Sequence, residues 1–123
     1  MIHINSQKHI RLVFTLKNTT AMELERWCDE LIVRIADMVC EAGHRLLAIN
    51  CTIADVHVFF ELCNDQSLYD LICDIKETNV RWLNEAGCDE EFEWEAGFQS
   101  EICQSTEVTQ IISQIHNLRS PMM

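Results

Sequence analysis

Apolar residues recur at two different spacings along this chain of 123 residues, and the order of these spacings limits the folds that it can adopt. A strand that buries one face is apolar at alternate residues, whereas a helix repeats its apolar positions every three or four residues. Strand-like patterns occur in residues 9–16, 46–52 and 56–62, and more weakly near 94–103. Helical spacing occurs in residues 24–42, 68–83 and 108–118.

The predicted order of elements is therefore β-α-β-β-α-β-α. A split β-α-β pattern of this kind predicts an α+β fold, a ferredoxin-like sandwich in which helices pack on a largely antiparallel sheet. Residues 53–55 would form the turn of an antiparallel hairpin between the second and third strands. Because the chain contains only three Gly and one Pro and is 48% hydrophobic, we expect one domain spanning residues 1–123.

Residues that favour helix starts precede the helical segments. Thr20 and Glu23 match the capping-box pattern S/T-x-x-E, in which each side chain satisfies a backbone N–H of the first turn. Ser67 is placed to cap the second helix, and Ser105 or Thr106 to cap the last one.

Neither a membrane span nor a secretion signal is expected. The sequence has no run of about 18 apolar residues, and residues 1–9 are polar where a signal peptide would be apolar. The seven cysteines include no C-x-x-C pair, which favours reduced thiols over disulfides or a zinc site. These features predict a cytoplasmic protein that does not enter a membrane.

The charge of the chain is −11 and is unevenly distributed. Residues 1–19 contain three cationic side chains and no acidic one, whereas residues 83–117 contain eight acidic side chains and no Lys or Arg. Proteins bind DNA largely by bringing cations to its phosphates. An acidic third of the chain therefore predicts weak DNA binding at best, and leaves open that the acidic surface binds a basic protein instead.

A single histidine, His57, lies within an apolar segment and follows Asp55 by two residues. In a strand, residues two apart point to the same face, so a carboxylate oxygen and an imidazole nitrogen would lie together. Taken by itself, a single histidine in an apolar strand is most often an ordinary residue of the core or surface.

Four segments, in this order and spacing, are similar to landmarks of one family, the single-strand DNA transposases of the insertion-sequence-200 kind and their relatives at repetitive extragenic palindromes. The resemblance covers nearly the whole chain. The segments are His9–Lys17 for the opening strand, Asp55–Val58 for the metal-binding strand, Ser67–Glu85 for the second helix and Trp94–Phe98 for the Trp-x-x-Gly-Tyr motif.

The resemblance implies a mechanism and a set of site residues. In that family two histidines bind a divalent metal, a tyrosine on the last helix attacks the scissile phosphate, and a glutamine one turn later helps to bind the metal. The enzymes work as dimers on single-stranded DNA hairpins. Carried over to this chain, the weak Mg²⁺ or Mn²⁺ ligands are Asp55, His57 and Gln114, and the DNA-binding residues are Lys8, Arg11, Lys17, Lys76 and Arg81.

This sequence departs from the family pattern at two chemically decisive positions. Asp55 stands where the first histidine belongs, and Gln110, or Ile111 with a slip of one residue, stands where the tyrosine belongs. The single tyrosine of the chain, Tyr69, lies in the second helical segment. The sequence therefore predicts a transposase-like protein without its nucleophile: an inactive, domesticated or decayed homodimer with weak DNA binding at best.

Two other functions remain open. Water could replace tyrosine in a residual metal-dependent nuclease. Alternatively, the acidic surface and the edge of the sheet could make the chain a protein-interaction module. The homodimer is expected to extend the sheet through residues 94–103, because an unpaired strand edge invites pairing, with Trp94 or Phe98 at the seam.

Overall fold

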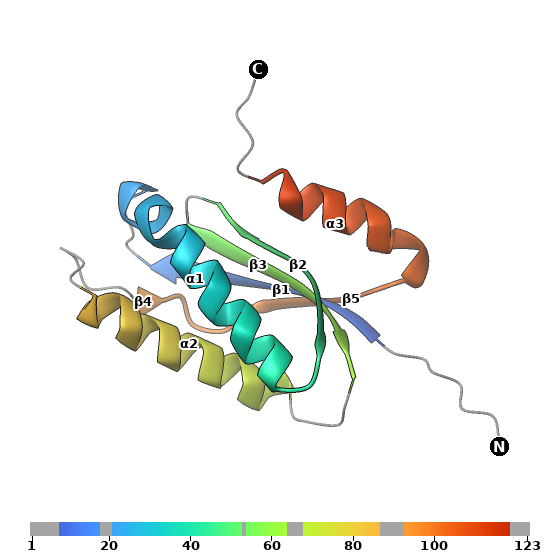
Figure 1. Ribbon diagram of the computed structural model, residues 1–123, viewed down its shortest axis with the longest axis horizontal. Coiled ribbons are helices and arrows are strands. Elements are labelled where there is room, and N and C mark those ends of the chain that lie inside the picture. Colours follow the sequence, from blue (N-terminus) through green and yellow to red (C-terminus); the bar gives the residue numbers. More distant parts are fainter. Residues whose placement is uncertain (1–7, 18–20, 53, 64–67, 87–92, 119–123) are drawn as a thin grey trace.

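The computed structural model describes residues 8–17, 21–52, 54–63, 68–86 and 93–118 (Figure 1). Its elements, in chain order, are β1 (Lys8–Lys17), α1 (Ala21–Glu41), β2 (Arg45–Cys51), β3 (Asp55–Leu62), α2 (Leu68–Glu85), β4 (Glu93–Trp94), β5 (Gln99–Cys103), a 3₁₀ turn (Ser105–Glu107) and α3 (Val108–His116). The predicted α+β class and element order are confirmed, except that the last strand is divided in two.

The sheet is antiparallel, and β1 lies at its centre. β3 pairs with β1 along its whole length and with β2 on its other side, which confirms the predicted hairpin. β4 and β5 both pair with the remaining edge of β1, at different positions along that strand. Gly97, whose φ is +75°, lies between β4 and β5, and glycine adopts this backbone conformation without a steric penalty.

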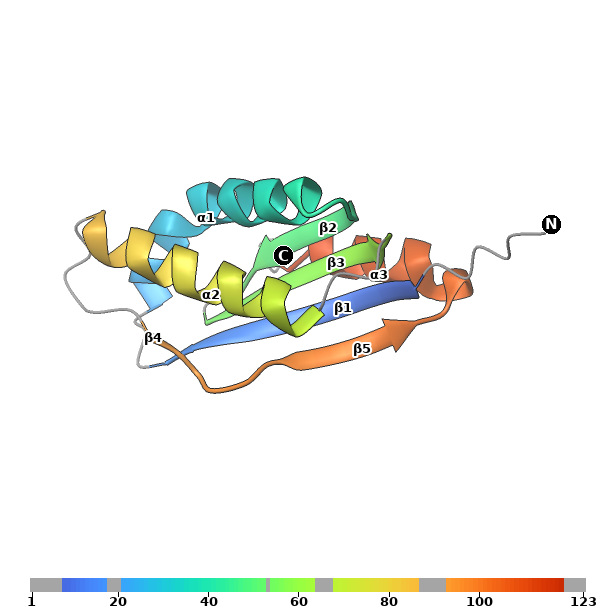
Figure 2. The same cartoon turned by 90° about the horizontal axis from the view of Figure 1, so that it is seen from below.

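The two faces of the sheet are covered by different helices. Alternation along β1 buries Ile10, Leu12, Phe14 and Leu16 in the larger core, which β1 shares with α1 and α2. A smaller core lies under α3, where Phe59 of β3 packs with Ile111 and Ile115. In Figures 1 and 2, α1 and α2 lie side by side across the sheet and α3 lies apart from both.

The residue that precedes the first turn of the last helix differs from the prediction. Gln104, and neither Ser105 nor Thr106, precedes the first turn: its backbone N–H donates to the Glu107 carboxylate at 2.9 Å, and the Glu107 N–H donates to its carbonyl at 2.9 Å. The other predicted caps, Thr20 and Ser67, lie outside the described residues. In the described part of the chain, no helix has the length and apolar character needed to cross a membrane.

Candidate functional site

The α3-facing side of the sheet carries residues that the sequence predicts as metal ligands. Val13 of β1 is opposite His57 of β3, and Thr15 is opposite Asp55, so these side chains share one face. α3 is held against the same face by Asn50 of β2, whose amide donates to the carbonyl oxygens of Ile115 at 2.9 Å and His116 at 3.3 Å. This docking brings Gln114 towards the β1–β3 pair.

Arg11 of β1 lies between two of the three predicted metal ligands. Its Nη2 is 3.3 Å from Nδ1 of His57, and its Nη1 donates to Oε1 of Gln114 at 3.5 Å. A guanidinium only donates hydrogen bonds and stays charged. Nδ1 of His57 is therefore the acceptor in this contact, and the neutral ring carries its proton on Nε2.

Asp55 makes its contacts next to this group. The Thr15 hydroxyl donates to its Oδ1 at 2.7 Å, and the backbone N–H of Asp55 donates to the Thr52 hydroxyl at 3.0 Å. Thr52 and Asp55 thus close the β2–β3 turn and fix where β3 begins. The structure joins His57 and Gln114 through a common partner, and places Asp55 on the same face with a partner of its own.

The environment of His57 disfavours a second positive charge. Burial lowers the pKa of His57 below its ordinary value, and the neighbouring Arg11 lowers it further. The Asp55 carboxylate raises the pKa but is the smallest of the three influences. The ring is therefore neutral at physiological pH, consistent with its role as an acceptor for Arg11.

The cluster does not fit a divalent metal ion as it stands. A metal would need the lone pair on Nδ1 of His57, which accepts a hydrogen bond from Arg11, and it would lie beside a permanent positive charge. Among the described residues, no group of three or more His, Cys, Asp and Glu side chains could hold a metal ion.

A pocket of about 320 Å³ opens beside the cluster. It is lined by Arg11, Val13, His57, Gln99, Ser100 and Glu101. Glu101 of β5 is opposite Arg11 in the strand register, so charges of both signs meet in the pocket.

The two positions at which the sequence analysis expects the family's tyrosine, Gln110 or Ile111, both lie on α3. Gln110 is exposed and Ile111 is buried in the smaller core, and neither side chain can attack a phosphodiester. Tyr69 lies on α2 and is 65% exposed. Because α2 packs on the face of the sheet opposite to α3 and His57, Tyr69 does not adjoin the cluster.

The five predicted DNA-binding cations are spread over the molecule. Lys8 and Lys17 lie at opposite ends of β1, and Lys17 is 3.9 Å from the carboxylate of Glu93. Arg81 of α2 pairs with Glu77 at 3.2 Å. Arg11 and α2 lie on opposite faces of the sheet, so these cations do not line one groove.

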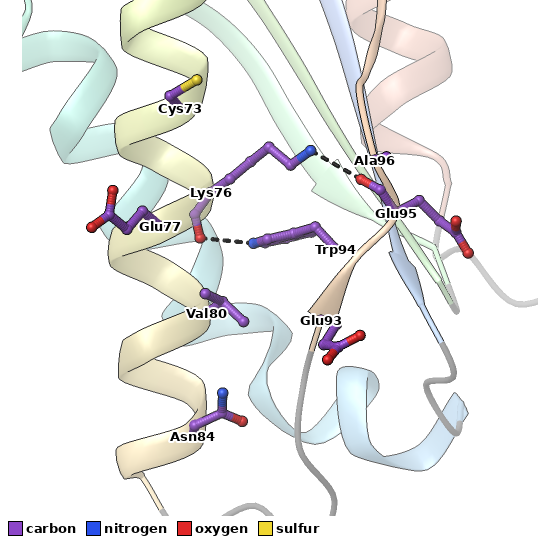
Figure 3. A pocket seen from close by; sticks show the side chains of 9 residues that line it. All are labelled: Cys73, Lys76, Glu77, Val80, Asn84, Glu93, Trp94, Glu95 and Ala96. Carbon is purple, nitrogen blue, oxygen red and sulfur yellow. Dashed lines mark hydrogen bonds between the residues drawn. The ribbon is translucent and has the colours of Figure 1, made fainter.

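Lys76 of α2 contacts the β4–β5 segment. It lines a second pocket, of about 540 Å³, that the sequence did not predict (Figure 3). Its ammonium donates to the carbonyl oxygens of Glu95 at 3.0 Å and Gly97 at 2.7 Å. Figure 3 shows the Trp94 indole, which donates to the Lys76 carbonyl at 2.8 Å. Lys76 therefore supports the β4–β5 segment from within the chain.

Strand periodicity could have identified Arg11 as a member of the cluster. Arg11, Val13 and Thr15 alternate along one strand, as Asp55 and His57 do along another. What the sequence alone did not contain was the register that sets the two strands against each other, and the docking of α3.

Comparison with known proteins agrees with this architecture. The family profile described as "Transposase IS200 like" matches residues 5–118. A search of curated proteins finds no match. A crystal structure of a candidate transposase from Deinococcus radiodurans is similar, with a TM-score of 0.71 and 15% identity over 98% of this chain and 100% of that one.

A second solved structure, of a REP-associated tyrosine transposase bound to a REP hairpin, has a TM-score of 0.64 and 12% identity. The similarity covers 95% of this chain and 68% of that one. At such identities the two structures establish a shared fold alone, whereas the profile match spans almost the entire chain. This chain therefore belongs to the IS200-like transposase family.

Proposed function

We propose that this chain is an IS200-like domain that does not cleave DNA and acts as a homodimer that binds single-stranded DNA weakly. The observation that carries the proposal is the composition of α3. The helix has Gln110, or Ile111 with a slip of one residue, where the family has its tyrosine, and Val108–His116 contains no tyrosine. A phosphotyrosine link cannot form without a phenol oxygen.

The cation distribution supports weak binding. Of the proposed phosphate contacts, Lys76 and Arg81 are engaged with groups of the same helix or its neighbours, and Lys17 lies beside Glu93. The guanidinium of Arg11 donates hydrogen bonds to His57 and Gln114. Each contact with DNA must compete with these intramolecular partners, so the affinity per cation falls.

The exposed edge of β5 supports the homodimer. Among the described strands, β5 pairs only with β1. Ile102 of β5 is 66% exposed, and Phe98, the residue before β5, is 36% exposed. Trp94 packs inside the chain against Phe14, with ring centroids 5.9 Å apart. We therefore place Phe98 and Ile102, in preference to Trp94, at the seam between two subunits.

A site for a basic protein is the second candidate function. The observation that favours it is the row of exposed carboxylates at Glu93, Glu95, Glu101 and Glu107, along β4, β5 and the turn before α3. The third alternative, a metal-dependent nuclease using water, gains no support because the cluster does not fit a metal.

A competition between single-stranded DNA and a basic peptide tests the proposal. Fluorescence anisotropy would follow a labelled single-stranded hairpin with the protein at low salt, and then with an excess of a lysine-rich peptide. We expect the protein to bind the hairpin weakly and to leave the oligonucleotide uncut. The matched variants are Lys8→Gln, which removes an exposed cation, and Glu107→Gln, which removes an exposed carboxylate. Binding of the peptide alone, weakened by Glu107→Gln, would contradict DNA binding and favour the second candidate.

A further inference from the structure

We propose that the guanidinium of Arg11 closes a latent divalent-metal site, and that Asp55, His57 and Gln114 bind Mn²⁺ only when this side chain is removed. In the native protein, the guanidinium of Arg11 then supplies the positive charge at this site. This inference concerns the cation and not the nucleophile, so it goes beyond the proposed loss of cleavage.

The first support is that two potential metal ligands meet at the same side chain. One planar group, the Arg11 guanidinium, receives electron pairs from Nδ1 of His57 at 3.3 Å and Oε1 of Gln114 at 3.5 Å. Atoms that accept hydrogen bonds from a guanidinium are the same atoms that can donate electron pairs to a metal. The two acceptors come from β3 and α3 and already meet at one position.

The second support is charge. Arg11 carries a permanent positive charge and cannot release it by deprotonation in the physiological range. A divalent ion at the same acceptors would be repelled by it at short range. Removal of the guanidinium would leave two neutral donors, with the Asp55 carboxylate on the same face to offset part of the metal charge.

The third support is that the site survives the loss of Arg11. α3 is also held by Asn50, which donates to the carbonyl oxygens of Ile115 and His116, and by the buried side chains of Ile111 and Ile115. These contacts do not involve Arg11. Gln114 should therefore stay near His57 when Arg11 is replaced.

Isothermal titration calorimetry with Mn²⁺ tests the inference on four proteins: wild type, Arg11→Ala, Arg11→Met and Arg81→Ala. The last is a matched control, because it also removes one arginine charge but does so at the Glu77 pair on α2. We expect the two Arg11 variants to bind Mn²⁺ roughly tenfold or more tightly than wild type. Arg81→Ala should bind as wild type does.

A double variant identifies the ligands. His57→Ala added to Arg11→Ala should abolish the gained affinity, whereas the same change in wild type should leave its Mn²⁺ titration unaltered. Two results would overturn the inference: Arg11 variants that bind no better than Arg81→Ala, or wild-type binding that depends on His57.

Thermal unfolding shows whether the variants are folded. Arg11→Met keeps the apolar stem of the side chain, so it should retain cooperative unfolding even where Arg11→Ala is impaired, and Mn²⁺ should raise its Tm. Loss of cooperative unfolding in both variants would contradict the claim that α3 is held independently of Arg11. A DNA-cleavage assay on the wild type reports on the nucleophile alone, so the two proposals can fail separately.

Discussion

The side chains of Arg11 and His57 show how the chemistry of one residue depends on its neighbour. From the family resemblance, the sequence predicts that His57 donates its lone pair to a metal. Here the Nδ1 atom of His57 lies 3.3 Å from a guanidinium nitrogen, and burial together with Arg11 lowers its pKa. In the structure the cation beside the ring is a guanidinium and not a metal ion. A histidine that matches a motif can therefore have a different partner from the one that the motif suggests.

His44 makes stability depend on pH. Burial lowers the pKa of His44 below its ordinary value of 6.5, and its Nδ1 accepts a hydrogen bond from the Cys63 N–H at 3.1 Å. The unfolded chain therefore binds this proton more readily than the folded one. The contribution to stability is complete above the unfolded pKa and is lost as the pH falls below it.

We accordingly expect the free energy of unfolding, measured in urea, to decrease below about pH 6.5. His44→Phe should make this dependence shallower, and the part that comes from the lowered pKa of His57 should remain. An unchanged slope in His44→Phe would show that another group is responsible.

At the scale of single elements, local pattern predicted most of the fold. The bounds of β1, α1, β2, β3 and α2 follow from spacings of two or of three to four residues. The last strand was less well predicted. It is divided into β4 and β5, which lie on either side of Gly97 and pair with two separate parts of β1. The predicted cap of the last helix, Ser105 or Thr106, was wrong because Gln104 and Glu107 bond to each other before the first turn.

The candidate site was predicted only in part. The shared face of Asp55 and His57 follows from strand periodicity alone. The contact between Arg11 and Gln114 joins residues 103 positions apart, and it depends on strand register and on how α3 docks. No local pattern contains that information, which is why Arg11 was predicted as a DNA contact and not as the partner of His57.

The docking of α3 rests on its smaller core, which yields a stability prediction. Ile115 is fully buried there, so Ile115→Ala should lower the free energy of unfolding by about 2–5 kcal/mol through lost burial and a cavity. Ile115→Val should cost about 1 kcal/mol. The control is Val33→Ala on α1, a 59% exposed position, which should change stability by less than about 0.5 kcal/mol. Similar values for Ile115→Ala and Val33→Ala in urea unfolding would mean that α3 is not docked as described.

At the scale of the whole molecule, the open edge of the sheet at β5 and the net charge bear on assembly and binding. The outer edge of β5 has no partner among the described strands, and the exposed Ile102 lies on it. The chain also carries a net charge of −11. The first feature favours assembly with a second copy, and the second opposes binding to nucleic acid.

Light scattering tests the assembly. We expect a mass of about twice 14.3 kDa at micromolar concentration. Ile102→Lys should shift the mass to that of one chain, because charged side chains on an edge strand oppose pairing. Val33→Lys, an exposed change on α1, is the control and should leave the dimer intact. A wild type that is monomeric would refute the proposed seam.

Salt dependence tests the binding of DNA. With three to five cations in contact, the slope of log K against log salt for single strands should be about −2 to −3.5. Arg81→Ala should make the slope shallower by less than about 1. Nanomolar affinity at physiological salt would show that the acidic surface opposes DNA less than we expect.

The most direct test of the central claim is a search for a covalent link between protein and DNA. Wild type and Tyr69→Phe would each be incubated with single-stranded hairpin oligonucleotides and Mn²⁺, then separated on a denaturing gel and weighed by intact-protein mass spectrometry. We predict uncut oligonucleotide and unmodified protein in both samples, because α3 provides no phenol oxygen and Tyr69 lies on the opposite side of the sheet. A protein–DNA adduct in the wild type would contradict this account, and its loss in Tyr69→Phe would identify Tyr69 as the nucleophile.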